Sequence, residues 1–449
     1  MGRSCIIHIG MHKTGTSSIQ VSLYNFSDDK YFYADLGMPN HSIPICMLFK
    51  TDPKRFKDLK DRSLQEINNI KKEAYERLVN SIKRSKSKTL IISGEGIRGL
   101  SKDELINFRS FLEERGFDDI KVFAYVRSPA GYMSSAFQEI LKHEPLHFSQ
   151  IRKCYPFYRA GFEKFYEVFG EGNVILRKFD PNRFPKGCVV RDFCNIFGIK
   201  LPEDRIKRIN ESFPEEVVKL IYILRNYKKN VKIKRNEIQR LGNYLSGRMK
   251  DLGLKKFKID GSLIKPIIEE NIEDIRWMEK RLGESLLEED IESMRGIRSE
   301  EDLLKVDRRV IDRLIEISGY SGEGDIKVSD IAEMVWDVLD KRVIKKVGKE
   351  IKGEEIRGRV VVKDSGKVVG WVMGKEPKEK VKVRVYINDE LKGEQIANKM
   401  RPKLKKRGIH PTGRCGFIFN LDRFLKKGDR IRVEYIYKDK VVDKEVIEI

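Results

Sequence analysis

A short loop near the start of the chain carries residue types that bind anions. The segment "IIHIGMHKTGTSSIQ" (6–20) begins with two β-branched apolar residues and then places Gly10, Lys13 and Gly15 among several hydroxyls. Where a strand ends in such a turn and a helix follows, backbone N–H groups and the positive end of the helix dipole point at the turn. The segment therefore predicts a phosphate-type loop.

The spacing of this loop departs from that of a Walker A nucleotide-binding loop. Gly10 and Gly15 keep the GxxxxG spacing, but Lys13 lies inside the loop and Thr16 stands where GxxxxGK[ST] has its lysine. The strand candidates "LIIS" and "FAYV" also end without the aspartate that would hold magnesium. These departures disfavour a magnesium-dependent NTPase. A nucleotide kinase of the P-loop class is therefore the second choice of enzyme.

A second pair of phosphate-binding residue types follows a later strand. In "YVRSPAGYMSSAFQ", Ser135 follows Arg127 by eight positions. A guanidinium binds phosphate oxygens bidentately, and a serine hydroxyl adds a neutral hydrogen bond. Taken singly, Arg127 fits a surface salt bridge and Ser135 fits a hydroxyl on a helix face. Their place after the strand favours a phosphate site.

The loop sequence "HKTGTSS" (12–18) resembles the 5′-phosphosulfate-binding loop of sulfotransferases that use 3′-phosphoadenosine-5′-phosphosulfate. The resemblance implies that Lys13 stabilises charge on the leaving phosphate oxygen, while Arg127 and Ser135 hold the 3′-phosphate. It also implies a set of residues that contact the co-substrate: His12 (which could instead touch the acceptor), Lys13, Thr14, Gly15, Thr16 and Ser17.

Further segments extend the resemblance over roughly the first 300 residues. "PNHS", "LIISGEG", "NVILRKFDP", "NESF" and "NIEDIRWMEKRLG" are similar to the branch of this family found with bacterial surface-polysaccharide genes. "GKVVGWVMG" and "CGFIFNL" resemble an accessory domain of bacterial glycan-modifying transferases. The implied activity is in-line transfer of a sulfuryl group to a carbohydrate hydroxyl, without a metal.

Sulfuryl transfer to a hydroxyl needs a base near the acceptor. Glu95, in "SGEG" just beyond a strand, is the first candidate, and a helix cap or loop salt bridge explains it equally well. His41, in "PNHS", is the second, because an unperturbed imidazole titrates near neutrality; a turn residue is the alternative interpretation. Arg177, after a further strand, could meet the co-substrate or the acceptor.

Two features of the sequence are of a kind that can bind metal ions, but their spacing does not support a metal site. "HEPLH" (143–147) matches the HExxH zinc signature, but Pro145 would break the continuous helix that two zinc-binding histidines require. The six cysteines show no CxxC pair, so neither a zinc site nor a disulfide framework is indicated. Buried free thiols are expected.

The pattern of apolar residues predicts the elements that position these groups. Strand candidates at 5–10, 88–93, 120–126 and 173–179 alternate with helical segments, one opened by a capping box from Ser101 to Glu104. Such alternation predicts an α/β domain with a P-loop-like, mostly parallel sheet and helices on both faces. Helical periodicity dominates from about 200 to 345, which predicts a helical extension and a first domain over 1–345.

Period-two alternation marks a second domain at 352–449. "KVKVRVYIND" alternates Val381, Val383, Val385 and Ile387, and "RIRVEYIYKDK" does the same at 431–437, so an all-β, sandwich-like domain is expected. The charged "KRVIKKVGKEIKGEE" (341–355) before it is the linker candidate.

The composition bounds the partners. No apolar run approaches the roughly 20 residues of a membrane span, so a cytoplasmic protein is expected. The net charge of +22 favours an anionic partner or an ordinary charge-rich surface, since 69 Asp and Glu accompany 91 Lys and Arg. The basic "KKNVKIKR" lacks a nucleic-acid motif, so no specific nucleic acid is expected. A non-catalytic glycan- or polyanion-binding protein is the alternative from a different class.

Overall fold

The computed structural model describes residues 2–11, 13–52, 63–209, 212–288, 290–322, 324–340, 347–352, 355–363, 367–376, 379–402, 404, 410–421 and 429–448. Contacts group Met1–Leu141, Leu146–Glu215 and Lys256–Leu303 into one unit. The second unit comprises Lys142–Pro145, Glu216–Lys255 and Leu304–Ile449.

A parallel sheet forms the centre of the first unit. Among the described residues it has five strands, in the order β2 (Tyr31–Tyr33), β3 (Thr89–Ser93), β1 (Arg3–His8), β4 (Phe117–Val126) and β5 (Val174–Lys178). The predicted strands near 5–10, 88–93, 120–126 and 173–179 are confirmed, within a few residues at their ends. Strand β2 was not predicted, because three residues are too few to show a period.

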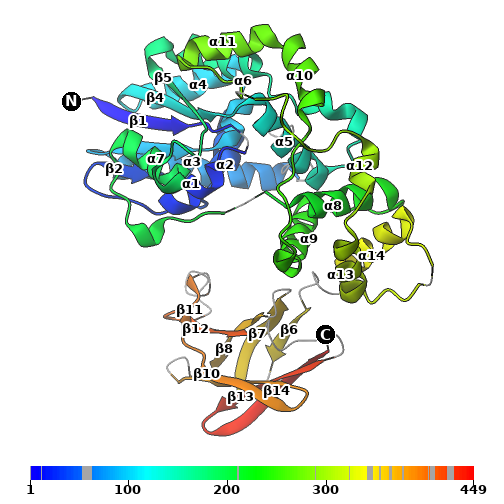
Figure 1. Ribbon diagram of the computed structural model, residues 1–449. Helices are drawn as coiled ribbons and strands as arrows, with labels where there is room; N and C mark the ends of the chain where they lie inside the picture. Colours follow the sequence, from blue (N-terminus) through cyan, green and yellow to red (C-terminus); the bar gives the residue numbers. More distant parts are fainter. Residues whose placement is uncertain are drawn as a thin grey trace. The chain divides into compact units, whose positions relative to one another are not determined.

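Helices cover both faces of this sheet (Figure 1). Side chains that alternate along β1 and β4 pack on one face against α1 and α7, while α4 and α6 contact β4. The predicted capping box is present, since Ser101 accepts from the Glu104 N–H and Glu104 accepts from that of Ser101. The helices of the first unit are α1 (Thr16–Leu23), α2 (Ser42–Phe49), α3 (Leu64–Arg84), α4 (Lys102–Glu113), α5 (Pro129–His143), α6 (Tyr158–Phe169), α7 (Val189–Phe197), α10 (Gly261–Glu270), α11 (Ile272–Leu282) and α12 (Glu300–Leu304). Helices α8 (Glu215–Tyr227) and α9 (Arg235–Arg248) belong to the second unit.

Helices continue after residue 304, as the sequence periodicity predicts. They are α13 (Arg308–Ser318) and α14 (Val328–Asp340). The expected domain boundary at 345 falls in 341–346, outside the described residues. Within the part of the chain that the structure describes, no helix combines the length and the apolar character that crossing a lipid bilayer requires.

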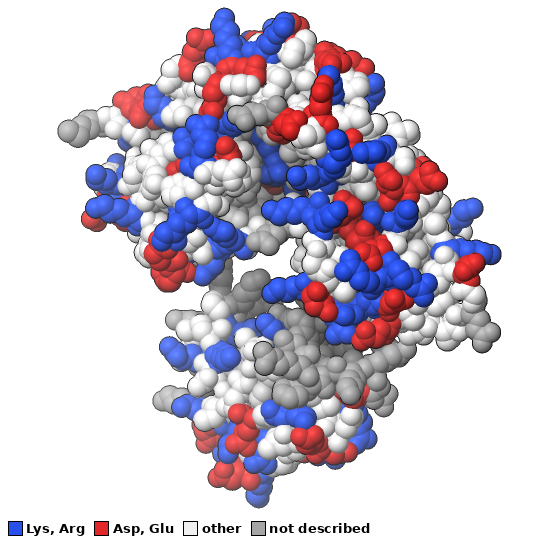
Figure 2. All heavy atoms as spheres, in the orientation of Figure 1, with Lys and Arg blue, Asp and Glu red and all other residues white. Residues whose placement is uncertain are grey.

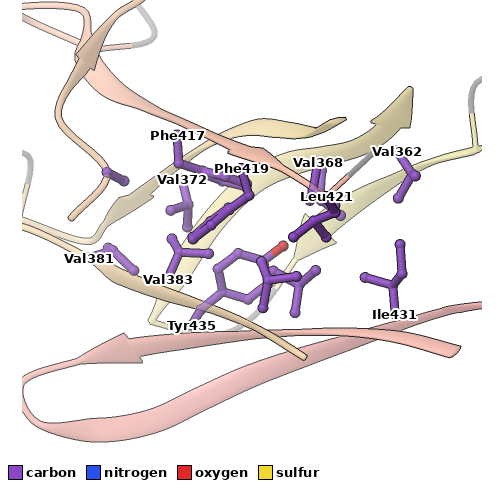
Figure 3. Packing of buried hydrophobic residues seen from close by; sticks show 14 of the residues in the cluster. Val362, Val368, Val372, Val381, Val383, Phe417, Phe419, Leu421, Ile431 and Tyr435 are labelled. Atoms are coloured by element: carbon purple, nitrogen blue, oxygen red, sulfur yellow. The ribbon is translucent and has the colours of Figure 1, made fainter. Parts of the chain in front are cut away.

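Antiparallel sheets form the C-terminal part of the chain. One has the order β10-β9-β13-β14 and the other β11-β12-β8-β7-β6. Val383, Val385 and Val433 are fully buried with Phe417 and Tyr435, in a core drawn from both sheets (Figure 3). The strands are β6 (Val347–Lys352), β7 (Ile356–Lys363), β8 (Lys367–Gly374), β9 (Lys382–Ile387), β10 (Glu390–Ile396), β11 (Lys399–Met400), β12 (Arg414–Asn420), β13 (Arg430–Tyr437) and β14 (Lys440–Glu448).

The fold class is therefore an α/β unit with a parallel sheet, followed by an all-β part. One detail of the sequence analysis was wrong: the linker candidate 341–355 includes strand β6, which pairs antiparallel with β7 over Val347–Lys352. The charges of "KRVIKKVGKEIKGEE" masked a strand because ladder hydrogen bonds come from the backbone and do not require apolar side chains.

Candidate functional site

Three neighbouring strands bring the predicted residues to one edge of the sheet. β1 lies between β3 and β4, and the chain passes to one side of β1 for β2 and β3 and to the other for β4 and β5. A parallel sheet opens a crevice at such a switch point, beyond the carboxyl ends of its strands. The loop containing Lys13 follows β1, Glu95 follows β3, and Arg127 follows β4 directly.

The loop after β1 has the backbone conformation of an anion cradle. Lys13 and Gly15 have positive φ angles of 68° and 75°. The Thr14 hydroxyl donates to the Met11 carbonyl at 2.6 Å and closes the turn. Helix α1 begins at Thr16, and its first helical hydrogen bonds run from the Ser18 and Ile19 N–H groups to the Gly15 carbonyl. The N–H groups of Thr16 and Ser17 precede these bonds and point out of the start of the helix. A Cβ on Gly15 would lie 2.6 Å from Val189 Cγ1, so the loop packs tightly against α7.

The remaining loop residues differ in exposure. Thr14 and Thr16 are buried, whereas Ser17 is half-buried. His12, which was predicted to contact the co-substrate, lies outside the residues that the structure describes.

Arg127 contacts the loop directly. Its Nη1 donates to the Lys13 carbonyl oxygen at 2.9 Å, joining residues 114 positions apart. Among the described residues, no carboxylate lies within ion-pair distance of its guanidinium. Burial lowers the pKa of Arg127, and the charge of Glu288 opposes that shift. The surface salt bridge considered above is therefore wrong for Arg127, which is a half-buried cation held at the loop.

Ser135 is a buried hydroxyl without a partner in the described structure. It lies on α5, is 2% exposed, and its Oγ has no hydrogen-bond partner among the described residues. Its neighbour Ser134 is satisfied, because that Oγ accepts from the Ile259 N–H at 3.1 Å. A buried polar atom without a partner costs about 1–3 kcal/mol, which a bound ligand oxygen would recover.

A second contact joins the loop to α5. Lys13 Nζ lies 3.7 Å from Glu139 Oε2, with both side chains largely buried. Glu139 is one helical turn after Ser135 and was missed by the sequence analysis. Its spacing of four from Ser135 places both on one face of α5, which is the signal that could have identified it.

The two candidate bases have different environments. Glu95 is half-buried and opens the 3₁₀ helix η3 (Glu95–Gly99). His41 is completely buried, its Nδ1 accepts from the Ser93 N–H at 3.0 Å, and burial lowers its pKa to about 3. This placement argues against His41 as the base, because its nitrogen is bound to backbone and the ring is closed off from solvent.

His8, to which the sequence analysis assigned no role, lies at the end of β1 next to Ser93 of β3. Its Nδ1 is 2.8 Å from Ser93 Oγ, and the Gly94 N–H donates to its carbonyl at 3.0 Å. Burial lowers the pKa of His8 to about 4, partly opposed by the charge of Glu95. His8 and His41 thus both bind Ser93 and fix the end of β3 from which Glu95 extends.

Arg177 lies within β5, not after it, and has a structural partner. Its Nε and Nη2 donate to the two oxygens of Asp192 at 2.7 and 2.6 Å, and the Tyr125 hydroxyl donates to the same carboxylate. Asp192 is 2% exposed. This bidentate pair, which the sequence analysis did not foresee, argues against Arg177 as a residue that contacts co-substrate or acceptor.

A cavity of about 500 Å³ opens beyond the far end of η3. Its lysines already have acceptors: Lys164 Nζ donates to the carbonyls of Arg98 and Leu100, and Lys50 Nζ to that of Gly99. Because these groups satisfy one another, we assign it no ligand. The cavity is lined by Lys50, Thr51, Asp52, Gly99, Leu100, Ser101, Glu104 and Lys164.

The metal-like motif and the cysteines have ordinary explanations. Helix α5 ends at His143, so "HEPLH" does not form the helix that the zinc signature requires. Among the described residues, no group of three or more His, Cys, Asp or Glu could hold a metal ion. All six cysteines are buried and unbridged, as predicted.

Comparison with known proteins adds little to this geometry. No family model matches the chain. An uncharacterized protein of Archaeoglobus fulgidus is 27% identical over 243 residues, which cover 51% of this chain and 62% of that protein. The endo-beta-1,4-mannanase from Thermotoga petrophila aligns over 99% of this chain and 97% of its own, at 11% identity. Its TM-score of 0.13 carries no argument about the fold.

Proposed function

We propose that the chain is a sulfotransferase that moves a sulfuryl group from 3′-phosphoadenosine-5′-phosphosulfate to a carbohydrate hydroxyl. The observation that carries the proposal is the 2.9 Å hydrogen bond from Arg127 Nη1 to the Lys13 carbonyl. It links two motifs, far apart in the sequence, to which the family resemblance assigns the two phosphate positions of one nucleotide.

The residues at this edge suit such a co-substrate. The positive-φ loop and the first turn of α1 offer N–H groups, and Lys13 offers an ammonium, to the 5′-phosphosulfate. Arg127 and the partnerless Ser135 hydroxyl suit the 3′-phosphate. The bound nucleotide supplies the sulfuryl group and a phosphate leaving group. The protein therefore needs to orient the two substrates, neutralise the charge on the leaving group and accept the proton of the acceptor hydroxyl.

Each catalytic role falls to a residue at the edge. Glu95 accepts the proton of the acceptor hydroxyl as that oxygen attacks sulfur. Lys13 neutralises the charge that develops on the leaving oxygen, and its neighbour Glu139 at 3.7 Å keeps the ammonium on the α5 side of the loop. Arg127 keeps the loop in position by donating a hydrogen bond to the Lys13 carbonyl.

Nucleotide binding tests the assignment. Titration calorimetry with 3′,5′-phosphoadenosine compares the unaltered protein with Lys13→Ala and Arg127→Ala, and Lys83→Ala serves as the control because this exposed cation lies on α3. Loss of a charge-assisted contact of about 1.5–3 kcal/mol weakens binding by roughly 10- to 150-fold in the two site variants only. Equal affinity in all four proteins would remove the co-substrate assignment.

Turnover separates the alternatives. Glu95→Gln is expected to retain nucleotide affinity and to lose sulfuryl transfer to a carbohydrate acceptor. Magnesium-dependent ATP turnover would favour the nucleotide kinase. Polyanion binding that persists in Lys13→Ala, without any turnover, would favour the binding protein. Figure 2 shows cationic and anionic side chains interspersed on the face in view, which is the pattern of an ordinary charge-rich surface.

A further inference from the structure

One carboxylate of the first unit occupies the start of helix α5. Glu288, six residues beyond α11, accepts a hydrogen bond from the Gly131 N–H through Oε1 at 3.0 Å. Its other oxygen, Oε2, is buried and has no hydrogen-bond partner among the described residues. A buried carboxylate oxygen without a donor is costly, so the positive field at this point must offset that cost.

Part of this field comes from Arg127, which is proposed to hold the 3′-phosphate. A Cβ on Gly131 would lie 3.0 Å from Arg127 Nε, so the guanidinium rests against the helix turn that Glu288 caps. Burial lowers the pKa of Arg127 and the charge of Glu288 partly opposes that shift, while burial, with a smaller contribution from Glu288, raises the pKa of Tyr158. The Tyr158 hydroxyl donates to the Arg127 carbonyl. The carboxylate and the guanidinium are near neighbours that are not in ion-pair contact.

Arg127 therefore has donors left for another anion. Its Nη1 donates to the Lys13 carbonyl. Among the described residues, its other two guanidinium nitrogens have no hydrogen-bond partner. Ser135 Oγ, two turns along α5, is likewise buried and without a partner. A phosphate bound by Arg127 and Ser135 would thus lie within electrostatic reach of Glu288.

We propose that Glu288 is an internal anion that competes with the 3′-phosphate for Arg127 and the positive end of α5, and so sets the affinity for the nucleotide. This inference rests on the proposed function. Like charges oppose each other strongly in a partly desolvated site. The carboxylate weakens binding of nucleotides that carry a 3′-phosphate and leaves those without it unaffected.

The test removes the negative charge of Glu288 and keeps its hydrogen bond to the start of α5. In Glu288→Gln the amide oxygen can still accept from the Gly131 N–H, and thermal unfolding confirms that the variant folds. Calorimetry is performed with 3′,5′-phosphoadenosine and with adenosine 5′-phosphate, which lacks the 3′-phosphate. Glu292→Gln is the matched control, because it removes one charge from an exposed carboxylate on the same segment.

Each outcome decides a separate question. Removal of one repelling charge is expected to tighten binding of 3′,5′-phosphoadenosine about tenfold in Glu288→Gln, with no change for adenosine 5′-phosphate or in Glu292→Gln. Equal tightening for both nucleotides, or none for either, overturns the role of Glu288 and leaves the proposed function standing. Failure of all three proteins to bind 3′,5′-phosphoadenosine overturns the proposed function and this inference with it.

Discussion

Two buried histidines should make the α/β unit sensitive to mild acid. His8 and His41 are fully buried, and burial lowers their pKa values to about 4 and about 3. An unfolded histidine has a pKa of about 6.5, so the unfolded state binds more protons than the folded state as pH falls from about 6.5 toward 4. The stabilisation from neutral burial is complete above pH 6.5 and is lost as pH decreases through this window.

The size of the effect follows from the linkage relation. At pH 5, protonation of a histidine with a pKa of about 6.5 stabilises the unfolded state by about 2 kcal/mol. The two histidines that the folded state keeps neutral therefore lower the free energy of unfolding by about 4 kcal/mol together. Carboxylates with lowered pKa values, such as Asp260 at about 2, lose their contribution at lower pH. The interval from pH 8 to pH 5 therefore isolates the histidines.

Urea unfolding across this interval measures the loss. Trp277, on α11, reports on the α/β unit when the other two tryptophans are replaced in a Trp336→Phe, Trp371→Phe background. His41→Asn should halve the acid-induced loss, because asparagine can accept from the Ser93 N–H without titrating. His147→Asn, at an exposed position, is the control. An unchanged loss in His41→Asn would refute the argument that its neutral burial carries half of the effect.

Three further substitutions probe the loop, the α5 hydroxyl and the β core. Gly15→Ala combines positive φ with a 2.6 Å clash and should lower the free energy of unfolding by more than about 1 kcal/mol, whereas Gly172→Ala, with no atom within 4 Å of the added Cβ, should be near neutral by urea titration. Ser135→Ala should weaken 3′,5′-phosphoadenosine binding without lowering the unfolding temperature, because no described group bonds the Ser135 hydroxyl. Ser134→Ala should instead cost about 1–3 kcal/mol of stability and little affinity, because its hydroxyl accepts from the Ile259 N–H. The reverse pattern would contradict the assignment. Phe417→Ala, at a fully buried position, should cost about 3–5 kcal/mol in the β part, and a loss below 1 kcal/mol would show that this core is loosely packed.

Local patterns predicted the elements that local physics determines. The capping box at Ser101 and the alternation at Val381–Ile387 depend on neighbours within a few residues, and both are present. The loop glycines signalled a turn for the same reason, since a positive φ at Gly15 is nearly free only for glycine. The parallel sheet followed from the alternation of strands and helices.

Long-range pairings escaped the sequence analysis because no local signal encodes them. Asp192 is an ordinary helix residue until the fold brings it to Arg177, and Glu288 is one of several acidic residues in a row until Gly131 donates to it. His41 was a candidate base, with a turn residue as the alternative, but the fold buries it completely at the start of α2 with its Nδ1 on the Ser93 N–H. Strand β6 was hidden by its charges.

The six buried thiols have a practical consequence. Thiolate is the reactive form of cysteine, and burial raises the pKa of Cys5, Cys46, Cys154, Cys194 and Cys415. The native protein should therefore resist maleimide reagents without any cysteine having to be removed. One cysteine introduced at an exposed position such as Lys83 would be a unique attachment point for a fluorophore, and the six native thiols would react only after the chain unfolds.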